Sequence, residues 1–177
     1  MLYCTMQNSI NFFTATILRW QHLLKQDKYK QMIIDKMQYL VDANRVWIYG
    51  FVIMPNHIHQ LWRAKEGHHE KEVQRDLLRY TAQHIKNDLV LNHPMVLPHF
   101  RSTQNDRHYH FWERRARSKE IENRKMLEQK LDYIHNNPVL DKWKLSNLPE
   151  DFYFSSASYY LSNQTPWSFI THYTQHI

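Results

Sequence analysis

The sequence predicts an α+β fold in which helices cover a four-stranded antiparallel sheet. Two apolar, β-rich runs, 46–54 and 57–63, are separated only by a Pro-Asn dipeptide. Such a tight break is typical of an antiparallel strand pair. Two further segments, 27–41 and 70–89, carry apolar residues at helical spacing. These observations together indicate one domain in which both kinds of element pack around a common core.

Length and composition also indicate one domain over residues 1–177. The chain has 177 residues, of which 42% are apolar and 14% aromatic, so it can build one sizeable core but hardly two. We expect the core to span about 10–138 and a C-terminal segment, 139–177, to wrap around it. Two glycines are too few for the Gly-rich phosphate loops of nucleotide-binding proteins.

Net charge and the lack of targeting signals limit the classes of partner and the cellular compartments to be expected. The formal charge is +6, with 13 histidines in addition, and this favours a polyanionic partner, with nucleic acid first. No run of 18 apolar residues predicts a membrane span, and the N-terminus lacks the pattern of a signal peptide. The single cysteine, Cys4, permits no internal disulfide. We therefore expect a cytoplasmic protein that does not contact membranes.

The first half of the chain predicts three strands and one helix. Residues 10–17 are β-rich and form the expected first strand. The expected helix over 27–41 follows. Residues 46–54 are almost entirely apolar, which predicts burial on both faces at the centre of the sheet. The third strand is expected at 57–63.

The second half predicts two helices, a long loop and a fourth strand. After the helix at 70–89, the segment 91–107 has no clean period and is expected to be a functional loop. The expected elements after it are a short aromatic strand at 108–114 and a helix over 119–136 with Ser118 as its N-cap. Pro138 should end that helix, because the residue before a proline avoids helical geometry.

The predicted order up to residue 114 is strand, helix, strand, strand, helix, strand. This order is the ferredoxin-like arrangement, with four antiparallel strands and two helices on one face. A further helix and a C-terminal tail are added to it.

Two histidines in the third predicted strand are the first candidates for chemistry. His57 and His59 are two residues apart and therefore share a face of the strand. Two neighbouring imidazoles can form half of a metal site, although strand histidines can also serve only as hydrogen-bonding groups. His108 and His110 have the same spacing, but they lie at the edge of the predicted loop, and we interpret them as a pair without a metal-binding role.

Tyr133 is the second candidate. Lys130 precedes it and Asn137 follows it by about one turn, so all three lie on one face of the predicted helix. The opposite stripe is apolar. Tyr133 could be a reactive phenol beside an oxygen ligand, or an amphipathic aromatic residue at the margin of the core. The spacing leaves both interpretations open.

Four motifs resemble one known family. These are MPNHIH at 54–59, FWERR at 111–115, YIHNNPV at 133–139 and DFYFSSASYY at 151–160. Together they resemble the REP-associated tyrosine transposases. These belong to the single-tyrosine HUH transposases, a group named for its His-hydrophobic-His (HUH) motif. The resemblance covers about residues 12–160. It implies a ferredoxin-like domain with the tyrosine on an added helix, in agreement with the elements predicted above.

The resemblance also implies a role for each candidate. His57 and His59 would hold a divalent metal ion, Asn137 would supply the third ligand, and Asn136 is the nearest substitute for it. Tyr133 would be the nucleophile, forming a 5′-phosphotyrosine intermediate that lets the strand be rejoined without ATP. Lys130 would help by favouring the phenolate. Imidazole ligands suit Zn²⁺, Mn²⁺ or Ni²⁺ better than Mg²⁺, but the family implies Mg²⁺ or Mn²⁺.

The substrate implied by the resemblance is single-stranded DNA with a hairpin, a repetitive extragenic palindrome. Unpaired bases stack on aromatic rings, and the strand follows a basic groove. The candidates for such contacts are Arg75, Arg79, Trp112, Arg114, Arg115 and Arg117. Each arginine could equally belong to a solvated helix face.

Two alternative functions remain open from the sequence. The chain could be a hairpin DNA-binding protein of the same fold that no longer cleaves. It could also be a metal-dependent phosphoesterase, although the sequence offers no further cluster of histidines or carboxylates for that chemistry. The oligomeric state, monomer or homodimer, is also left open.

Overall fold

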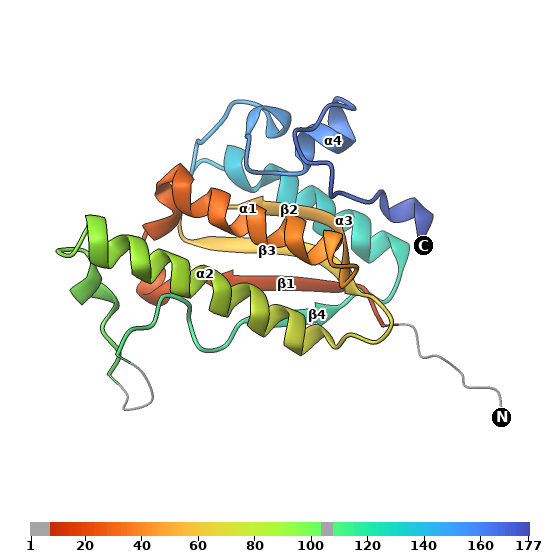
Figure 1. Ribbon diagram of the computed structural model, residues 1–177. Helices are drawn as coiled ribbons and strands as arrows, with labels where there is room; N and C mark the ends of the chain where they lie inside the picture. The colour runs from red at the N-terminus through yellow and green to blue at the C-terminus, as the bar shows by residue number, and fades with distance from the viewer. Residues whose placement is uncertain (1–7, 104–107) are drawn as a thin grey trace.

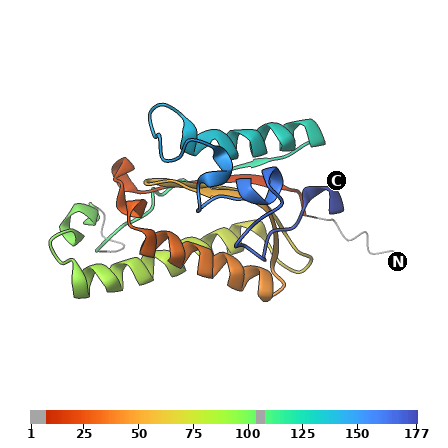
Figure 2. The same ribbon diagram turned by 90° about the horizontal axis from the view of Figure 1, so that it is seen from above.

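The computed structural model describes residues 8–103 and 108–177, so Cys4 lies outside the described residues. A four-stranded antiparallel sheet in the order β2-β3-β1-β4 carries α1 and α2 on one face and α3 on the other (Figures 1 and 2). The strands are β1 (Asn11–Thr16), β2 (Val46–Ile53), β3 (His57–Ala64) and β4 (Arg117–Glu120), and the helices are α1 (Asp27–Asp42), α2 (Glu70–Asn92), α3 (Arg124–Asn136) and the short α4 (Ala157–Leu161). The predicted ferredoxin-like arrangement is confirmed.

The two faces of the sheet are covered to different extents. In β1 the residues that face α1 and α2, such as Phe13 and Ala15, are fully buried, whereas Phe12, Thr14 and Thr16 on the other face are half-buried. Helix α3 packs on that second face against β2 and β3. The second face is therefore partly open over β1, and the polar side chains of β3 lie beside this opening.

The prediction that 46–54 is a central strand is wrong, because β2 is an edge strand of the four-stranded sheet. Its free edge is covered by the C-terminal segment: the N–H of Ile53 donates to the carbonyl of Phe154, and the N–H of Ser156 donates to the carbonyl of Phe51. A second contact, from the N–H of Thr171 to the carbonyl of Ile48, continues this cover. Burial by the tail therefore explains why an edge strand is apolar throughout.

The predicted strand at 108–114 is also wrong, because β4 lies at Arg117–Glu120. The aromatic residues Phe111 and Trp112, which suggested a strand, instead belong to the core on the side of α1 and α2. All four residues of β4 are exposed. Pairing with the backbone of β1, rather than any apolar pattern, holds this edge strand in place.

Helix α3 begins later than predicted, ends at Asn136 as predicted, and is followed by a residue whose geometry differs from the prediction. Residues 117–120 belong to β4, so Asn123 and not Ser118 is the N-cap, and its side chain accepts a hydrogen bond of 2.9 Å from the N–H of Met126. Asn137 keeps helical backbone angles (φ −55°, ψ −45°) in spite of Pro138, because a 3₁₀ turn, η4 (Asn137–Val139), continues directly from α3. The predicted change of geometry before the proline does not occur.

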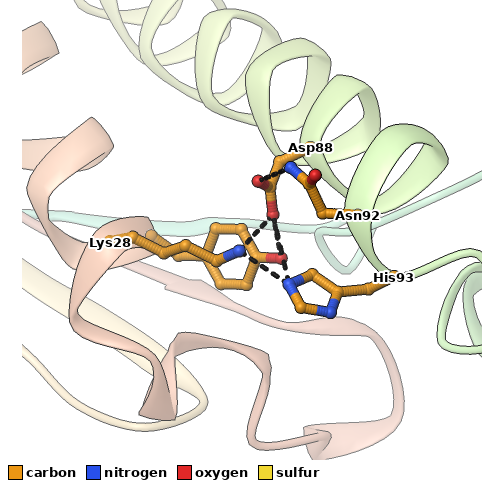
Figure 3. A network of polar contacts seen from close by, with 5 residues as sticks. Lys28, Asp88, Asn92 and His93 are labelled. Atoms are coloured by element: carbon orange, nitrogen blue, oxygen red, sulfur yellow. Dashed lines mark hydrogen bonds and ion pairs between the residues drawn. The ribbon is translucent and has the colours of Figure 1, made fainter.

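A polar network joins α1 to α2 (Figure 3). The carboxylate of Asp88 accepts hydrogen bonds from the ammonium of Lys28 at 2.6 Å, the hydroxyl of Tyr29 at 2.7 Å and the amide of Asn92 at 2.8 Å. The imidazole of His93 lies 2.8 Å from the Lys28 nitrogen. The network fixes the two helices on the face away from α3. Among the described residues, no helix is both long enough and apolar enough to cross a lipid bilayer.

Candidate active site

His57 and His59 lie side by side on β3, on the face that α3 partly covers. Their ring centroids are 4.7 Å apart. Nδ1 of His57 lies 2.7 Å from Oδ1 of Asn56, and because an amide oxygen can only accept, Nδ1 donates. Nδ1 of His59 is engaged at 2.7 Å by the hydroxyl of Thr14. Nε2 of His57 therefore keeps the lone pair, Nε2 of His59 is the nitrogen outside the Thr14 contact, and the hydrogen bonds at Nδ1 fix both ring orientations.

Both imidazoles are held neutral. Burial lowers the pKa of His57 to about 4, and the charge of Lys142 acts in the same direction. Burial lowers the pKa of His59 to about 3, with further contributions from His57, Lys130 and Lys142. The protonated ring is disfavoured because it would lose hydration and stand near other cations. At neutral pH both rings therefore carry the lone pair that metal coordination requires.

Tyr133 projects from α3 toward the same place. Its ring centroid is 5.2 Å from that of His59, with the rings inclined at 65°. Phe12 of β1 supports both rings, stacking on His59 and meeting the edge of Tyr133. The side chain of Tyr133 is 47% exposed, so the phenol is open to solvent and is not a core residue. The structure thus brings together the tyrosine and the paired histidines that the sequence singled out.

Asn137 is a suitable further ligand. It is 2% exposed and lies one helical turn beyond Tyr133, on the same face of α3. Its Oδ1 is buried without a hydrogen-bond partner among residues 8–103 and 108–177, which is unusual for a buried amide oxygen. Asn136 is exposed, and its amide donates back to the carbonyl of Asp132. An amide oxygen and neutral imidazoles are donor types that fit a divalent cation.

No group of three or more His, Cys, Asp or Glu side chains that could hold a metal occurs in the described part of the chain. A metal at this site would therefore depend on the amide oxygen in addition to the two imidazoles. His108 and His110, which have the same spacing, differ in environment, since His108 is exposed and His110 is buried.

Cationic side chains surround the candidate site. The Lys130 nitrogen lies 4.7 Å from the ring centroid of Phe12 and 5.7 Å from that of Tyr133. Arg117 of β4 is opposite Thr14, which is itself opposite His59, so these three side chains share one face in a row across the sheet. Lys119, opposite Phe12, lies on this face as well. These positions would attract an anionic strand to the site.

The other predicted DNA contacts lie elsewhere. Arg75 and Arg79 are exposed on α2, which covers the opposite face of the sheet. Trp112 is 7% exposed, and its indole N–H donates to the hydroxyl of Thr81, so it is a core residue and cannot stack on a base in this structure. Arg114 and Arg115 are exposed just before β4.

Sequence reasoning missed three residues close to the paired histidines. Trp20 and Trp143 contact the ring of His57, and the charge of Lys142 reaches both imidazoles. All three come from turns between regular elements, where no periodicity marks them. An aromatic residue beside a lysine, as at 142–143, was the available signal.

Neither protein-family models nor curated proteins give a match to this sequence. Among solved structures, a REP-associated tyrosine transposase bound to a REP hairpin matches with a TM-score of 0.60 and 22% identity, over 88% of this chain and 81% of that chain. A candidate transposase from Deinococcus radiodurans R1 matches with a TM-score of 0.47 and 15% identity, over 72% of this chain and 90% of that chain. The first match shows a shared fold, and the predicted resemblance is confirmed at that level.

Proposed function

We propose that this chain is a transposase-like enzyme that cuts and rejoins single-stranded DNA next to a hairpin. The observation that carries the proposal is the approach of the exposed Tyr133 ring to the neutral His59 ring, at 5.2 Å. A purely structural role for Tyr133 does not explain the two buried imidazoles near it, nor the Oδ1 of Asn137, which has no hydrogen-bond partner among the described residues. The fold shared with a hairpin-bound REP-associated tyrosine transposase supports DNA as the substrate.

The proposed reaction is nucleophilic displacement at phosphorus. The phenol of Tyr133 loses its proton to solvent as its oxygen forms a bond to the phosphorus atom, the bond from phosphorus to the 3′ oxygen breaks, and that oxygen takes up a proton from solvent. The products are a 5′-phosphotyrosine and a free 3′ hydroxyl. Attack by a 3′ hydroxyl on the phosphotyrosine reverses the step, so the strand can be rejoined without a nucleotide cofactor.

The side chains around Tyr133 have distinct tasks in this proposal. His57, His59 and Asn137 would hold Mg²⁺ or Mn²⁺, which when bound would offset the negative charge of the scissile phosphate. Lys130, whose nitrogen lies 5.7 Å from the Tyr133 ring centroid, would place a positive charge near the scissile phosphate. Arg117 and Lys119 would hold the phosphates of the flanking strand. Replacing His57, His59 or Asn137 should reduce cleavage more than it reduces DNA binding.

The experiment is a search for a covalent adduct. The protein is incubated with Mn²⁺ and a labelled library of single-stranded DNA hairpins with random flanks, and adducts are resolved on a denaturing gel. We expect an adduct with the wild type that is absent in Tyr133→Phe. Tyr39→Phe is the matched control, because Tyr39 is 56% exposed on α1, which lies on the other side of the sheet.

Other outcomes would contradict the proposal. Tight hairpin binding with no adduct would indicate a DNA-binding protein that does not cleave. Cleavage that survives Tyr133→Phe would indicate a phosphoesterase that uses water rather than the tyrosine.

A further inference from the structure

Two tryptophans from distant parts of the chain flank His57. The Trp20 ring, at the end of the 3₁₀ turn η1 (Leu18–Trp20), meets His57 with a centroid distance of 6.4 Å and an angle of 65°. Trp143, which follows η4, lies 5.8 Å from the same imidazole at 50°. The ring centroid of His22 lies 5.7 Å from that of Trp143. The candidate metal ligand thus contacts two indole rings.

Trp20 is unusually exposed for its size and position. Its side chain is 63% exposed, and among the described residues its one ring contact is the edge-on approach to His57. A single exposed aromatic ring is common at protein surfaces, and what distinguishes Trp20 is its contact with the buried imidazole of His57. Most of the surface of Trp20 is therefore accessible to a planar group.

The backbone that presents Trp20 is strained. Arg19 and Trp20 have φ values of 55° and 58°, in the left-handed region that non-glycine residues rarely occupy. Two neighbouring residues of this kind persist only where surrounding contacts hold them, and such strain is found preferentially at functional sites. The strained turn therefore indicates that the position of the indole matters more than the stability it costs.

One side chain links this turn to the candidate metal ligand. The amide nitrogen of Asn56 donates to the carbonyl of Trp20 at 3.1 Å, while its oxygen accepts from Nδ1 of His57 at 2.7 Å. Asn56 therefore fixes Trp20 relative to His57. Anything stacked on the indole would be held at a defined distance from the scissile phosphate.

We infer that Trp20 is a stacking platform for an unpaired nucleobase next to the scissile phosphate, with Trp143 as the second aromatic wall. Lys142, whose nitrogen lies 5.6 Å from the Trp143 centroid, is placed to contact the adjoining phosphate. Stacking is tolerant of sequence, because every base has an aromatic face. This inference rests on the proposed function, since it assigns the base-binding part of the same site.

The experiment separates base stacking from phosphate binding. Fluorescence anisotropy measures the affinity of the full chain, in EDTA, for a labelled oligothymidine 12-mer and for a 12-mer of abasic nucleotides with the same phosphates. We expect the wild type to prefer the oligothymidine. Trp20→Ala should weaken oligothymidine binding by about 5- to 100-fold and leave abasic binding nearly unchanged. Trp20→Phe should keep most of the preference.

Tyr39→Ala is the matched control, an exposed aromatic residue on the opposite side of the sheet that should change neither affinity. An equal loss for both 12-mers in Trp20→Ala, no loss for either, or a wild type that does not prefer bases would overturn the inference. A base preference that depends on Trp20 in a protein that forms no tyrosine adduct would support this inference while the proposed cleavage fails.

Discussion

His57 and His59 show how burial can prepare a side chain for metal binding. Both rings are enclosed between β1, α3 and the turn after η4, where a positive charge would be poorly hydrated. Burial lowers the pKa of His57 to about 4 and that of His59 to about 3. Protons therefore compete for these nitrogens only when the pH falls close to these pKa values. At neutral pH a metal ion would meet neutral ligands.

The neutral state of the two imidazoles predicts an unusually weak pH dependence of metal affinity. Two ordinary imidazoles would each be about 90% protonated at pH 5.5, so a site built from them would lose about 100-fold in affinity relative to pH 7.5. Because the pKa values of His57 and His59 lie lower, we expect the affinity for Mn²⁺ to fall less than about threefold. Isothermal titration calorimetry measures it, with His59→Ala as the control that should not bind. A loss near 100-fold would contradict the neutral state assigned to the pair.

At the scale of elements, Gly50 sets the distance between β2 and α3. A Cβ added at Gly50 would lie 2.5 Å from Cδ2 of Leu131, so it would force the Leu131 side chain, or the helix that carries Tyr133, to shift. Gly50→Ala should destabilise the protein by about 1–3 kcal/mol through overpacking. It should also displace α3, which carries Tyr133 and leads directly into Asn137, so adduct formation and Mn²⁺ affinity should both fall.

A double-mutant cycle tests this packing explanation. Leu131→Ala alone leaves a cavity and is destabilising. Because it removes the clashing methyl group, the variant with both Gly50→Ala and Leu131→Ala should be less destabilised than the two single changes added together. Urea denaturation gives the three free energies of unfolding. Simple additivity would mean that Gly50 does not govern the helix position.

The network between α1 and α2 predicts how stability depends on acid. Burial raises the pKa of Asp88, but hydrogen bonds from Lys28, Tyr29 and Asn92 outweigh it and lower the pKa to about 2. The unfolded state, with a carboxyl pKa of about 3.9, takes up protons first as the pH falls. The stabilisation is therefore complete above about pH 4 and is lost as the pH approaches 2.

Asp88→Asn should reduce the free energy of unfolding by about 1 kcal/mol at pH 7, since the carboxylate borders solvent, and should flatten the loss between pH 4 and 2. Urea denaturation at several pH values measures both effects. Asp35→Asn, a change at an exposed position of α1, is the control. A pH dependence that Asp88→Asn leaves unchanged would show that another carboxylate is responsible.

The elements that sequence reasoning predicted well are those with a strong period or a distinct turn. The Pro-Asn break defined the pair β2 and β3, and the stripe of Leu127, Leu131 and Ile134 defined the buried face of α3. β4 was missed because its four residues are exposed and acquire their strand geometry from pairing with β1. The edge position of β2 was missed because its apolar side chains reflect cover by a tail distant in sequence.

The candidate site likewise contains residues that the sequence predicted and residues that it did not. The two histidines and Tyr133 were identified from motifs, and the structure places them together. Trp20 and Lys142 were not identified, because they stand in irregular turns whose proximity to His57 results from the whole fold.

At the scale of the whole molecule, the tyrosine and the paired histidines belong to one chain. We therefore predict that the catalytic unit is complete in each copy, whether the protein is a monomer or a homodimer. Tyr133→Phe and His59→Ala, each inactive alone, should remain inactive when mixed in equal amounts. Recovery of adduct in the mixture would show that the tyrosine of one chain acts at the histidines of another.

The most direct measurement of the central claim is the identification of the bond between protein and DNA. Wild-type protein that has reacted with a hairpin oligonucleotide in Mn²⁺ is digested with protease, and the nucleotide-bearing peptide is sequenced by mass spectrometry. We predict a 5′-phosphate ester on the Tyr133 oxygen and a released fragment with a 3′ hydroxyl. A nucleotide on any other side chain, or cleavage with no attached nucleotide, would contradict the assignment of Tyr133 as the nucleophile.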